Sequence, residues 1–235
     1  MSTSRVRSIP RIGRHSNGML MTPEEFDAIT AYDELYDYEL IHGVLVVNPI
    51  PSEAESDPNE ELGHLLRTYQ ELNPEGTVLD KTLPERYLQL ADSRRKADRV
   101  IWAGLGRPPD PKTDVPAIAV EFVSKRKRDR IRDHEEKRRE YLALGIREYW
   151  IIDRFRRIMT VFCAPPAEPS ERVIEANGVY RTPLLPGFEL ALARLLDLAD
   201  DWKQPRSRPS VRRRVGLGLI AGAGADYNVP NPCCR

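Results

Sequence analysis

Two acidic residues interrupt apolar, strand-like segments near the middle of the chain. Asp98 lies within KADRVIW (residues 96–102), and Glu121 lies within PAIAVEFVS (residues 116–124). A carboxylate in a strand with both faces covered is costly unless it is paired with a cation or binds a metal. Two such acids in successive strands suggest a shared cation, and oxygen ligands favour Mg²⁺ or Mn²⁺. Such an ion holds a phosphate and lowers the pKa of water, so the pair indicates phosphodiester chemistry.

The same acids also have a purely structural explanation. An acid in a strand can lie at a solvent-facing edge or pair with a nearby base, and RRKADR (residues 94–99) supplies several bases. An unrelated α+β domain with solvated acids would place Asp98 and Glu121 on opposite faces of its sheet. The two explanations therefore differ in where the structure places the two carboxylates.

Residues 116–153 predict a strand, a helix and a second strand that would carry Glu121. The segment opens with a run rich in Ala, Ile and Val, and continues through a basic turn into a charged stretch without Pro or Gly. It then reaches Gly145 and closes on an apolar run that ends at Asp153. Apolar runs on both sides of a long charged segment are typical of two buried strands joined by a helix.

Elements on the N-terminal side of the acids follow from capping and turn signals. Thr22, Pro23 and Glu25 predict the start of a short helix. Residues 38–47 predict two strands that turn at His42-Gly43, with Glu39 in the first strand. A second helix is expected to begin near residues 57–59, because apolar residues recur with helical spacing up to Leu72.

The remaining segments give weaker signals. Strands are expected at residues 78–79, 86–90, 97–102 and 158–163, a hairpin over residues 173–180 around Asn177-Gly178, and a short helix at about residues 192–198. A chain of 235 residues allows one domain with tails. We expect a disordered basic arm over residues 1–19, a folded domain over 20–202 and a disordered tail over 203–235.

Composition excludes several classes of protein. The formal net charge is zero, so no global basic field indicates nucleic-acid binding. The three cysteines form neither a disulfide framework nor a metal-binding spacing, which favours a reducing compartment. The N-terminus lacks the apolar core of a signal peptide, and residues 215–225 are too short and glycine-rich to span a bilayer. We therefore expect a soluble, cytoplasmic protein without membrane association.

The order of these segments closely resembles the PD-(D/E)xK nuclease superfamily and, more specifically, the Uma-type family of restriction endonucleases found widely in bacteria. The resemblance covers roughly residues 21–199. It rests on MTPEEF (21–26), YELIHG (38–43), the Asp98 strand, VEFVS (120–124), DHEEK (133–137), GIREYWIID (145–153) and LLPGFEL (184–190).

The resemblance implies an α/β (α+β) fold with a restriction-endonuclease-like core, in which helices flank a mixed central β-sheet. It implies a metal-dependent endonuclease that hydrolyses DNA phosphodiester bonds with Mg²⁺ or Mn²⁺. Asp98 matches the acid of the PD half-motif, and Glu121 matches the acid of ExK. The superfamily adds the backbone carbonyl of the next residue, here Phe122, as a metal ligand, and Glu39 matches an upstream acid that completes the site.

One position departs from the superfamily pattern. Val123 stands where the ExK motif has Lys, a residue that orients the attacking water and stabilises charge on phosphorus. In the Uma-type family a helix lysine takes this role, and Lys137 lies at the matching position. A helical wheel places Lys137 on the flank of the inward arc beside Tyr141, but Arg138 falls in the middle of that arc. Alternatively, Lys137 pairs on the surface with Glu140 or Asp133.

Two classes of function remain open at this stage. The leading hypothesis is a DNA endonuclease with Asp98, Glu121 and Lys137 as catalytic residues, which works as a homodimer when two strands are cut. The alternative is a protein that keeps the nuclease fold, has lost cleavage, and binds nucleic acid or a protein partner. Tyr141, Tyr149 and Trp150 could stack on bases or pack the helix on the sheet. Ser124 and the basic turn at residues 125–128 are candidate phosphate contacts.

Overall fold

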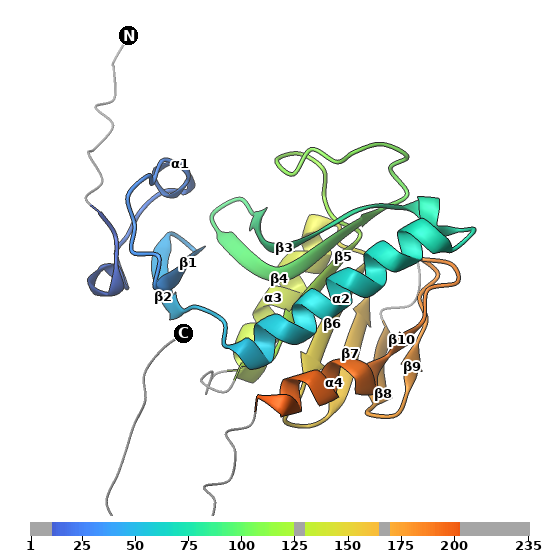
Figure 1. Cartoon of the computed structure of the whole chain (residues 1–235). Helices are drawn as coiled ribbons and strands as arrows, with labels where there is room; N and C mark the ends of the chain where they lie inside the picture. The colour runs from blue at the N-terminus through green and yellow to red at the C-terminus, as the bar shows by residue number, and fades with distance from the viewer. Residues whose placement is uncertain (1–10, 125–129, 165–169, 203–235) are drawn as a thin grey trace, which may run out of the picture. The chain divides into compact units, whose positions relative to one another are not determined.

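A mixed β-sheet of eight strands organises the part of the chain that the structure describes (Figure 1). The computed structural model describes residues 11–124, 130–164 and 170–202, with the side chains of residues 130–134 left aside. The main sheet has the order β2-β1-β4-β5-β6-β7-β8, and β3 pairs with β4 outside this path. A second, two-stranded sheet joins β9 and β10.

The bounds of the elements follow the chain. The strands are β1 (Tyr36–Ile41), β2 (Val44–Pro49), β3 (Leu79–Gln89), β4 (Arg94–Ala103), β5 (Ile118–Phe122), β6 (Glu148–Asp153), β7 (Ile158–Cys163), β8 (Ser170–Glu175), β9 (Val179–Tyr180) and β10 (Leu190–Ala191). The helices are α1 (Pro23–Asp27), α2 (Glu53–Leu72), α3 (Arg130–Leu144) and α4 (Leu192–Asp201), with 3₁₀ turns η1 (Arg14–Ser16) and η2 (Gly76–Val78).

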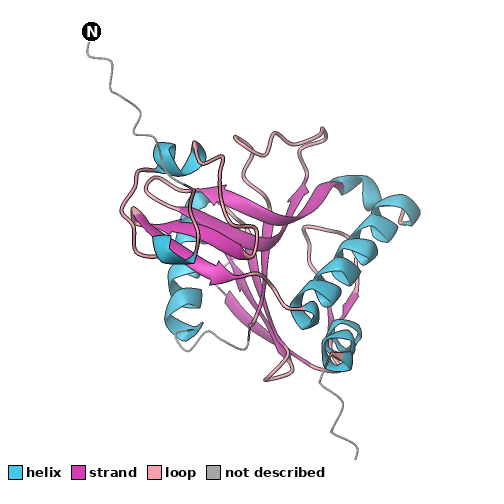
Figure 2. Cartoon of the chain, turned by 60° about the vertical axis from the view of Figure 1, so that its left-hand side comes forward, coloured by secondary structure: helices cyan, strands magenta, loops and turns pink. Residues whose placement is uncertain are grey.

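Helices cover both faces of the sheet, which confirms the predicted α/β fold. Leucines of α2 and α4 pack with β4, β5 and β6 residues in one core, which includes Trp150. Tyr141 of α3 packs on the opposite face with Val100 and Tyr149. Figure 2 shows these two helical layers on either side of the strands. Among the described residues, no helix is long and apolar enough to cross a membrane.

The predicted strand-helix-strand unit forms between β5 and β6. These two strands pair in parallel, with Val120 opposite Trp150, and α3 connects them. Every other pairing within the main sheet is antiparallel. All five residues of β5 are buried, as expected for a central strand covered on both faces. Glu121 is therefore held in the middle of the sheet.

The β1–β2 hairpin places Glu39 beside the central strands. Its turn has His42 at φ 48° and Gly43 at φ 76°, the left-handed pair that two-residue hairpins favour. The His42 backbone N–H donates to Ser93 Oγ at 2.9 Å, and the pair Leu40–Arg94 joins β1 to β4. The predicted turn is confirmed, and it fixes the register in which Glu39 approaches β4.

Several expected elements differ from the structure. Helix α2 begins at Glu53 rather than near residue 57, because the Glu55 carboxylate accepts the Ser52 backbone N–H at 2.8 Å and caps an earlier first turn. The separate strands expected at residues 78–79 and 86–90 are joined in one strand, β3, whose pairing with β4 keeps its register across Glu85. Pro84 and Glu85 are residue types that strands disfavour, so the sequence divides a strand that the structure continues.

The hairpin expected over residues 173–180 does not form. Gly178 N–H donates to Glu175 O at 2.7 Å, so the turn exists, but β8 pairs with β7 and β9 pairs with β10. Tyr180 is buried and donates its hydroxyl to Glu148 at 3.0 Å. Tertiary contacts of Tyr180 therefore separate two strands that local turn chemistry would pair.

Part of the expected N-terminal arm is ordered. Ile12 is buried at 2% exposure and bridges to Tyr32, and Gly18 N–H donates to Leu45 O at 2.7 Å. Residues 11–19 therefore pack on the hairpin, which corrects the expectation for this part of the arm. Ile12 and Met19 of this segment pack in the apolar cluster of the hairpin, and their burial favours this arrangement. Residues 1–10 and the tail from 203 onward lie outside the described residues.

A buried arginine on the α2 face gives a stability prediction. A Cβ atom at Gly63 of α2 would lie 2.7 Å from Arg99 Nη2, and Asn59 and Thr82 already hold that guanidinium. In a helix, Gly→Ala ordinarily stabilises by about 1 kcal/mol. We expect Gly63→Ala instead to lower the free energy of unfolding by about 2 kcal/mol, measured in urea, because Arg99 must leave its partners. A more stable variant would contradict this packing.

Candidate active site

The register of β4 and β5 brings the two sequence-predicted acids together. The strands are antiparallel with Arg99 opposite Val120, so the next position places Asp98 opposite Glu121. Both residues line one cavity of about 90 Å³. The unrelated domain with its acids on opposite faces is therefore not what the structure shows.

All five residues that the resemblance selects line this cavity. It is lined by Asp37, Glu39, Asn48, Pro49, Pro51, Glu55, Lys96, Asp98, Glu121, Phe122, Ser124 and Lys137. These residues come from the hairpin, the start of α2, the central strands and α3. Elements distant in sequence therefore converge on a single polar cavity.

The Asp98 carboxylate is anchored by the neighbouring strand. Its Oδ2 accepts the backbone N–H of Phe122 at 2.6 Å, and its own carbonyl accepts from Asn59 Nδ2 at 2.8 Å. Asn59 is in turn held by Arg99 Nε at 2.7 Å. Helix α2 and strand β5 therefore fix the backbone and the side chain of Asp98, respectively.

Glu121 receives two donors from α3. Lys137 Nζ donates to Glu121 Oε1 at 2.9 Å, and the Tyr141 hydroxyl donates to the same oxygen at 3.2 Å. Glu121 is 5% exposed and Lys137 is 1% exposed. Burial raises the pKa of Tyr141 well above its ordinary value, with the Glu121 charge acting in the same direction, so the hydroxyl stays a donor.

Glu39 is a second carboxylate beside Lys137. Its Oε1 accepts the Lys96 backbone N–H at 2.9 Å and lies 3.5 Å from Lys137 Nζ. Its Oε2 accepts from Asn48 Nδ2 at 3.3 Å. Lys137 Nζ also donates to the Lys96 carbonyl at 3.2 Å. Backbone atoms of β4 thus help to position both side chains.

Lys137 is buried, at 1% exposure. It pairs with Glu121 and Glu39, whereas Glu140 pairs with Arg95 at 2.7 Å, so the alternative surface pair with Glu140 does not form. The side chain of Asp133, the other partner considered, lies outside the described residues. Arg138 turns its guanidinium over the Phe162 ring at 4.1 Å. The apolar residues of α3 do not define a buried face. The carboxylates in the sheet that pair with Lys137 therefore determine which face of α3 points inward.

Other candidate contacts divide into two groups. Tyr141, Tyr149 and Trp150 are fully buried, so they pack the core and do not present a stacking surface. Ser124 lines the cavity, but the basic turn at residues 125–128 lies outside the described residues. Sequence reasoning missed Asn48 and the donor role of Tyr141. The role of Tyr141 has a signal in the sequence, namely its four-residue spacing from Lys137, because residues four apart lie on one helix face.

A second cluster of ionisable groups joins α3 to the hairpin turn. Ligand atoms of His42, Glu136 and Glu140 lie within 4.8 Å of one another. The buried guanidinium of Arg95 pairs with Glu136 at 2.9 Å and with Glu140 at 2.7 Å. A cation already shared by both carboxylates opposes a metal there, so we interpret the cluster as an ion-pair network that ties α3 to β4.

The network predicts a pH dependence of stability. Hydrogen bonds from His42 to Asp92 at 2.8 Å and to Glu136 at 3.2 Å raise its pKa above 6.5, with the Asp92 bond as the larger cause. Protonated His42 therefore adds stability that is fully present below pH 6.5 and lost as pH rises through the higher folded value. In urea unfolding, the excess stability of wild type over His42→Gln should shrink from pH 5.5 to about pH 8.5. A difference independent of pH would contradict the network.

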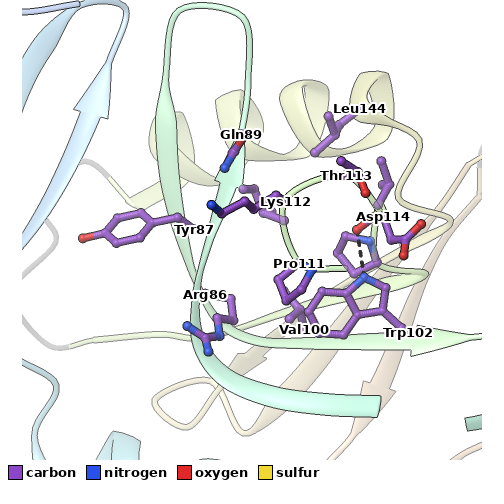
Figure 3. Close-up of a pocket in the computed structure, with 13 residues that line it drawn as sticks. Arg86, Tyr87, Gln89, Val100, Trp102, Pro111, Lys112, Thr113, Asp114 and Leu144 are labelled. Carbon is purple, nitrogen blue, oxygen red and sulfur yellow. Dashed lines mark hydrogen bonds between the residues drawn. The ribbon is translucent and has the colours of Figure 1, made fainter. Parts of the chain in front are cut away.

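A larger cavity, of about 120 Å³, lies away from the carboxylates (Figure 3). Val100, Trp102 and Leu144 give it apolar walls, and the Trp102 indole donates to the Asp114 carbonyl at 2.8 Å. A hydrogen bond from Arg107 lowers the pKa of Asp114 to about 2, so this acid is fully engaged in closing the loop. Size alone therefore does not identify the site.

Comparisons with known proteins agree with the fold. Residues 23–193 match the Uma2 family, described as "Putative restriction endonuclease". A crystal structure described as a "putative nuclease belonging to DUF820" from Anabaena variabilis aligns with 76% of this chain and 99% of its own, at 15% identity and a TM-score of 0.62.

A second structure, the type IIG restriction endonuclease BpuSI, aligns with 64% of this chain and 16% of its own, at 15% identity and a TM-score of 0.34. No curated protein matches the sequence. The family match spans most of the chain and includes every residue of the predicted site. The chain therefore belongs to the Uma2 family and has a restriction-endonuclease-like fold.

Proposed function

We propose that the protein is a metal-dependent endonuclease that hydrolyses DNA phosphodiester bonds in the cavity between the hairpin, the central strands and α3. The observation that carries the proposal is the pairing of Lys137 with Glu39 and Glu121 in the cavity that Asp98 also lines. The family description supports a restriction-type nuclease, and DNA is the substrate of that class.

The donor set of the cavity fits a hard divalent cation. Among the described residues, its walls carry five carboxylates and two lysine ammonium groups, an excess of negative charge. Lys96 is already paired with Asp37 at 2.6 Å, and Lys137 is paired with Glu39 and Glu121. Carboxylate and carbonyl oxygens are the ligands that Mg²⁺ and Mn²⁺ prefer.

Glu39, Asp98, Glu121 and the carbonyl of Phe122 would hold the ion. When bound, Mg²⁺ or Mn²⁺ would polarise the phosphate and make water a stronger nucleophile. Hydrogen bonds from Phe122 N–H, Lys96 N–H and Tyr141 hold the carboxylates in place. Donors that hold ligand side chains in one orientation strengthen metal binding.

The remaining chemistry falls to Lys137. Hydrolysis forms a bond from a water oxygen to phosphorus and breaks one phosphorus–ester oxygen bond, while negative charge grows on the phosphoryl oxygens. The Lys137 ammonium, next to Glu121, would orient the water and stabilise that charge. Lys137 thereby takes the role of the motif lysine, whose position Val123 occupies in this chain. Val123 packs in the core, at 3% exposure.

A non-cleaving nuclease-fold protein is the competing function. The absence of the motif lysine at Val123 motivates this alternative. The burial of Lys137 between two carboxylates instead favours a site that retains a lysine ammonium for catalysis. Cutting both strands of a duplex at one position needs two such cavities, so we also propose a homodimer as the active form.

Cleavage of supercoiled plasmid tests the proposal. The wild-type protein should nick or linearise the plasmid with about 5–10 mM Mg²⁺ or Mn²⁺, a concentration that saturates weak divalent sites. It should be inactive with a chelator. Asp98→Asn should be inactive under the same conditions. DNA binding without cleavage by the wild-type protein, at every metal tested, would favour the competing function.

A further inference from the structure

Tyr141 shares the helix face of Lys137 and contacts the same carboxylate oxygen. The two residues are one helical turn apart on α3, and their donor atoms lie 3.2 Å and 2.9 Å from Glu121 Oε1. Tyr141 is fully buried, at 0% exposure. A buried hydroxyl aimed at a carboxylate that faces the cavity does more than fill space, because it constrains how that carboxylate can turn.

The surrounding aromatic residues hold the Tyr141 ring in place. It packs edge-on against Tyr149, with ring centroids 5.1 Å apart and an interplanar angle of 79°. Tyr149 in turn stacks on Phe162 at 6.2 Å and 26°. A ring packed on neighbouring rings has little freedom. The hydroxyl therefore provides a fixed point to which the Glu121 carboxylate adjusts.

Lys137 cannot provide that fixed point alone. The acceptors near its ammonium include Glu121, Glu39 and the Lys96 carbonyl. A flexible lysine that moves toward a phosphate would release Glu121 Oε1. Tyr141 would still hold this oxygen during such a movement.

We propose that Tyr141 is a positioning residue of this site, one that fixes the rotation of the Glu121 carboxylate and thereby sets its affinity for a divalent cation. This inference rests on the proposed metal-dependent function. Tyr141 touches neither metal nor substrate; it acts through Glu121.

The chain offers a matched control on the opposite face of the sheet. Tyr180 is also buried, and its hydroxyl donates to another buried glutamate, Glu148, at 3.0 Å. Glu148 is held by Trp150 at 2.9 Å and by Thr182 at 2.6 Å, and it does not line the cavity. Tyr180→Phe therefore removes the same kind of bond without touching the site.

The test is Mn²⁺ titration by calorimetry on the full chain without DNA, together with melting temperatures and cleavage as a function of Mg²⁺ concentration. Tyr141→Phe should weaken Mn²⁺ binding about 10-fold and raise the Mg²⁺ concentration for half-maximal cleavage by a similar factor, the loss typical of an outer hydrogen-bond partner. Cleavage at saturating Mg²⁺ should fall less. Tyr180→Phe should leave Mn²⁺ affinity unchanged, whatever its effect on melting temperature.

Tyr141→Gln separates hydrogen bonding from packing. Gln keeps an N–H donor but loses the ring, so its Mn²⁺ affinity should exceed that of Tyr141→Phe if the hydrogen bond matters. Equal Mn²⁺ affinity in wild type and Tyr141→Phe, or a lower affinity in Gln than in Phe, would overturn the inference. Failure of the wild-type protein itself to bind Mn²⁺ or cleave would instead overturn the proposed function.

Discussion

Replacing Glu121 with Gln is expected to reduce plasmid cleavage to background and to weaken Mn²⁺ binding more than about 100-fold. Loss of an outer hydrogen-bond partner costs roughly 10- to 100-fold in metal affinity, and loss of a direct charged ligand costs more. Gln has almost the same shape as Glu, so the effect reports charge. Lys137 and Tyr141 both donate to one oxygen of Glu121, and an amide oxygen can still accept both hydrogen bonds, but the amide has no negative charge and its second oxygen is replaced by NH₂.

Glu148→Gln is the matched control for this substitution. Glu148 is also a buried glutamate, on the neighbouring strand β6, and it accepts hydrogen bonds from Trp150, Tyr180 and Thr182. The substitution should lower stability by disturbing these bonds, yet leave the Mn²⁺ affinity of the folded protein unchanged. If both variants lost Mn²⁺ binding to the same extent, Glu121 would have no specific role.

Replacing Lys137 with Met should separate cleavage from metal binding. Removal of a group that stabilises transition-state charge typically lowers the rate about 100- to 1,000-fold. Met fills a similar volume without charge, so we expect a loss of that order in the cleavage rate at saturating Mg²⁺. Mn²⁺ affinity should be retained or increased, because a competing cation next to Glu39 and Glu121 has been removed.

The same variant has a thermodynamic signature. Lys137 is 1% exposed, and removal of one partner of a buried ion pair costs about 3–5 kcal/mol. Metal-free Lys137→Met should therefore be less stable than wild type by about that amount, and saturating Mn²⁺ should recover much of the loss. Thermal unfolding with and without Mn²⁺ measures both effects. A variant that loses Mn²⁺ binding together with cleavage would show that Lys137 only maintains the structure.

The two acids of the site could be predicted from the sequence because of the apolar segments in which they lie. Asp98 and Glu121 interrupt apolar runs that become central strands, and an ionisable group in such a strand is informative. Their adjacency was not predictable from pattern alone. It depends on the antiparallel register of β4 and β5, which pairs Arg99 with Val120 across a loop too long to fix the register locally.

The orientation of α3 shows a different limit. Its sequence RIRDHEEKRREYLAL has charged residues on every side, so apolar periodicity does not define a buried face. Lys137 points toward the sheet because it pairs with Glu121 and Glu39. These acids lie on β5 and β1, so the sequence of α3 does not contain this information. The family resemblance identified Lys137, whereas helix geometry alone left it on the flank.

Local signals succeeded where the interaction is local. The capping residues of α1 and the His42-Gly43 turn form as expected, since each depends on neighbours within a few residues. The Asn177-Gly178 hairpin failed because Tyr180 contacts Glu148, which lies 32 residues away in the sequence. The burial of Arg95 and Arg99 escaped prediction for the same reason, since their partners lie on distant helices.

A crystal structure with Mn²⁺ tests the central claim most directly, because anomalous scattering locates the ion. The proposed site predicts a Mn²⁺ peak in the 90 Å³ cavity, with carboxylate oxygens of Asp98 and Glu121 at about 2.1 Å. A peak among His42, Glu136 and Glu140 instead, or no peak near Asp98 and Glu121 at saturating Mn²⁺, would contradict it.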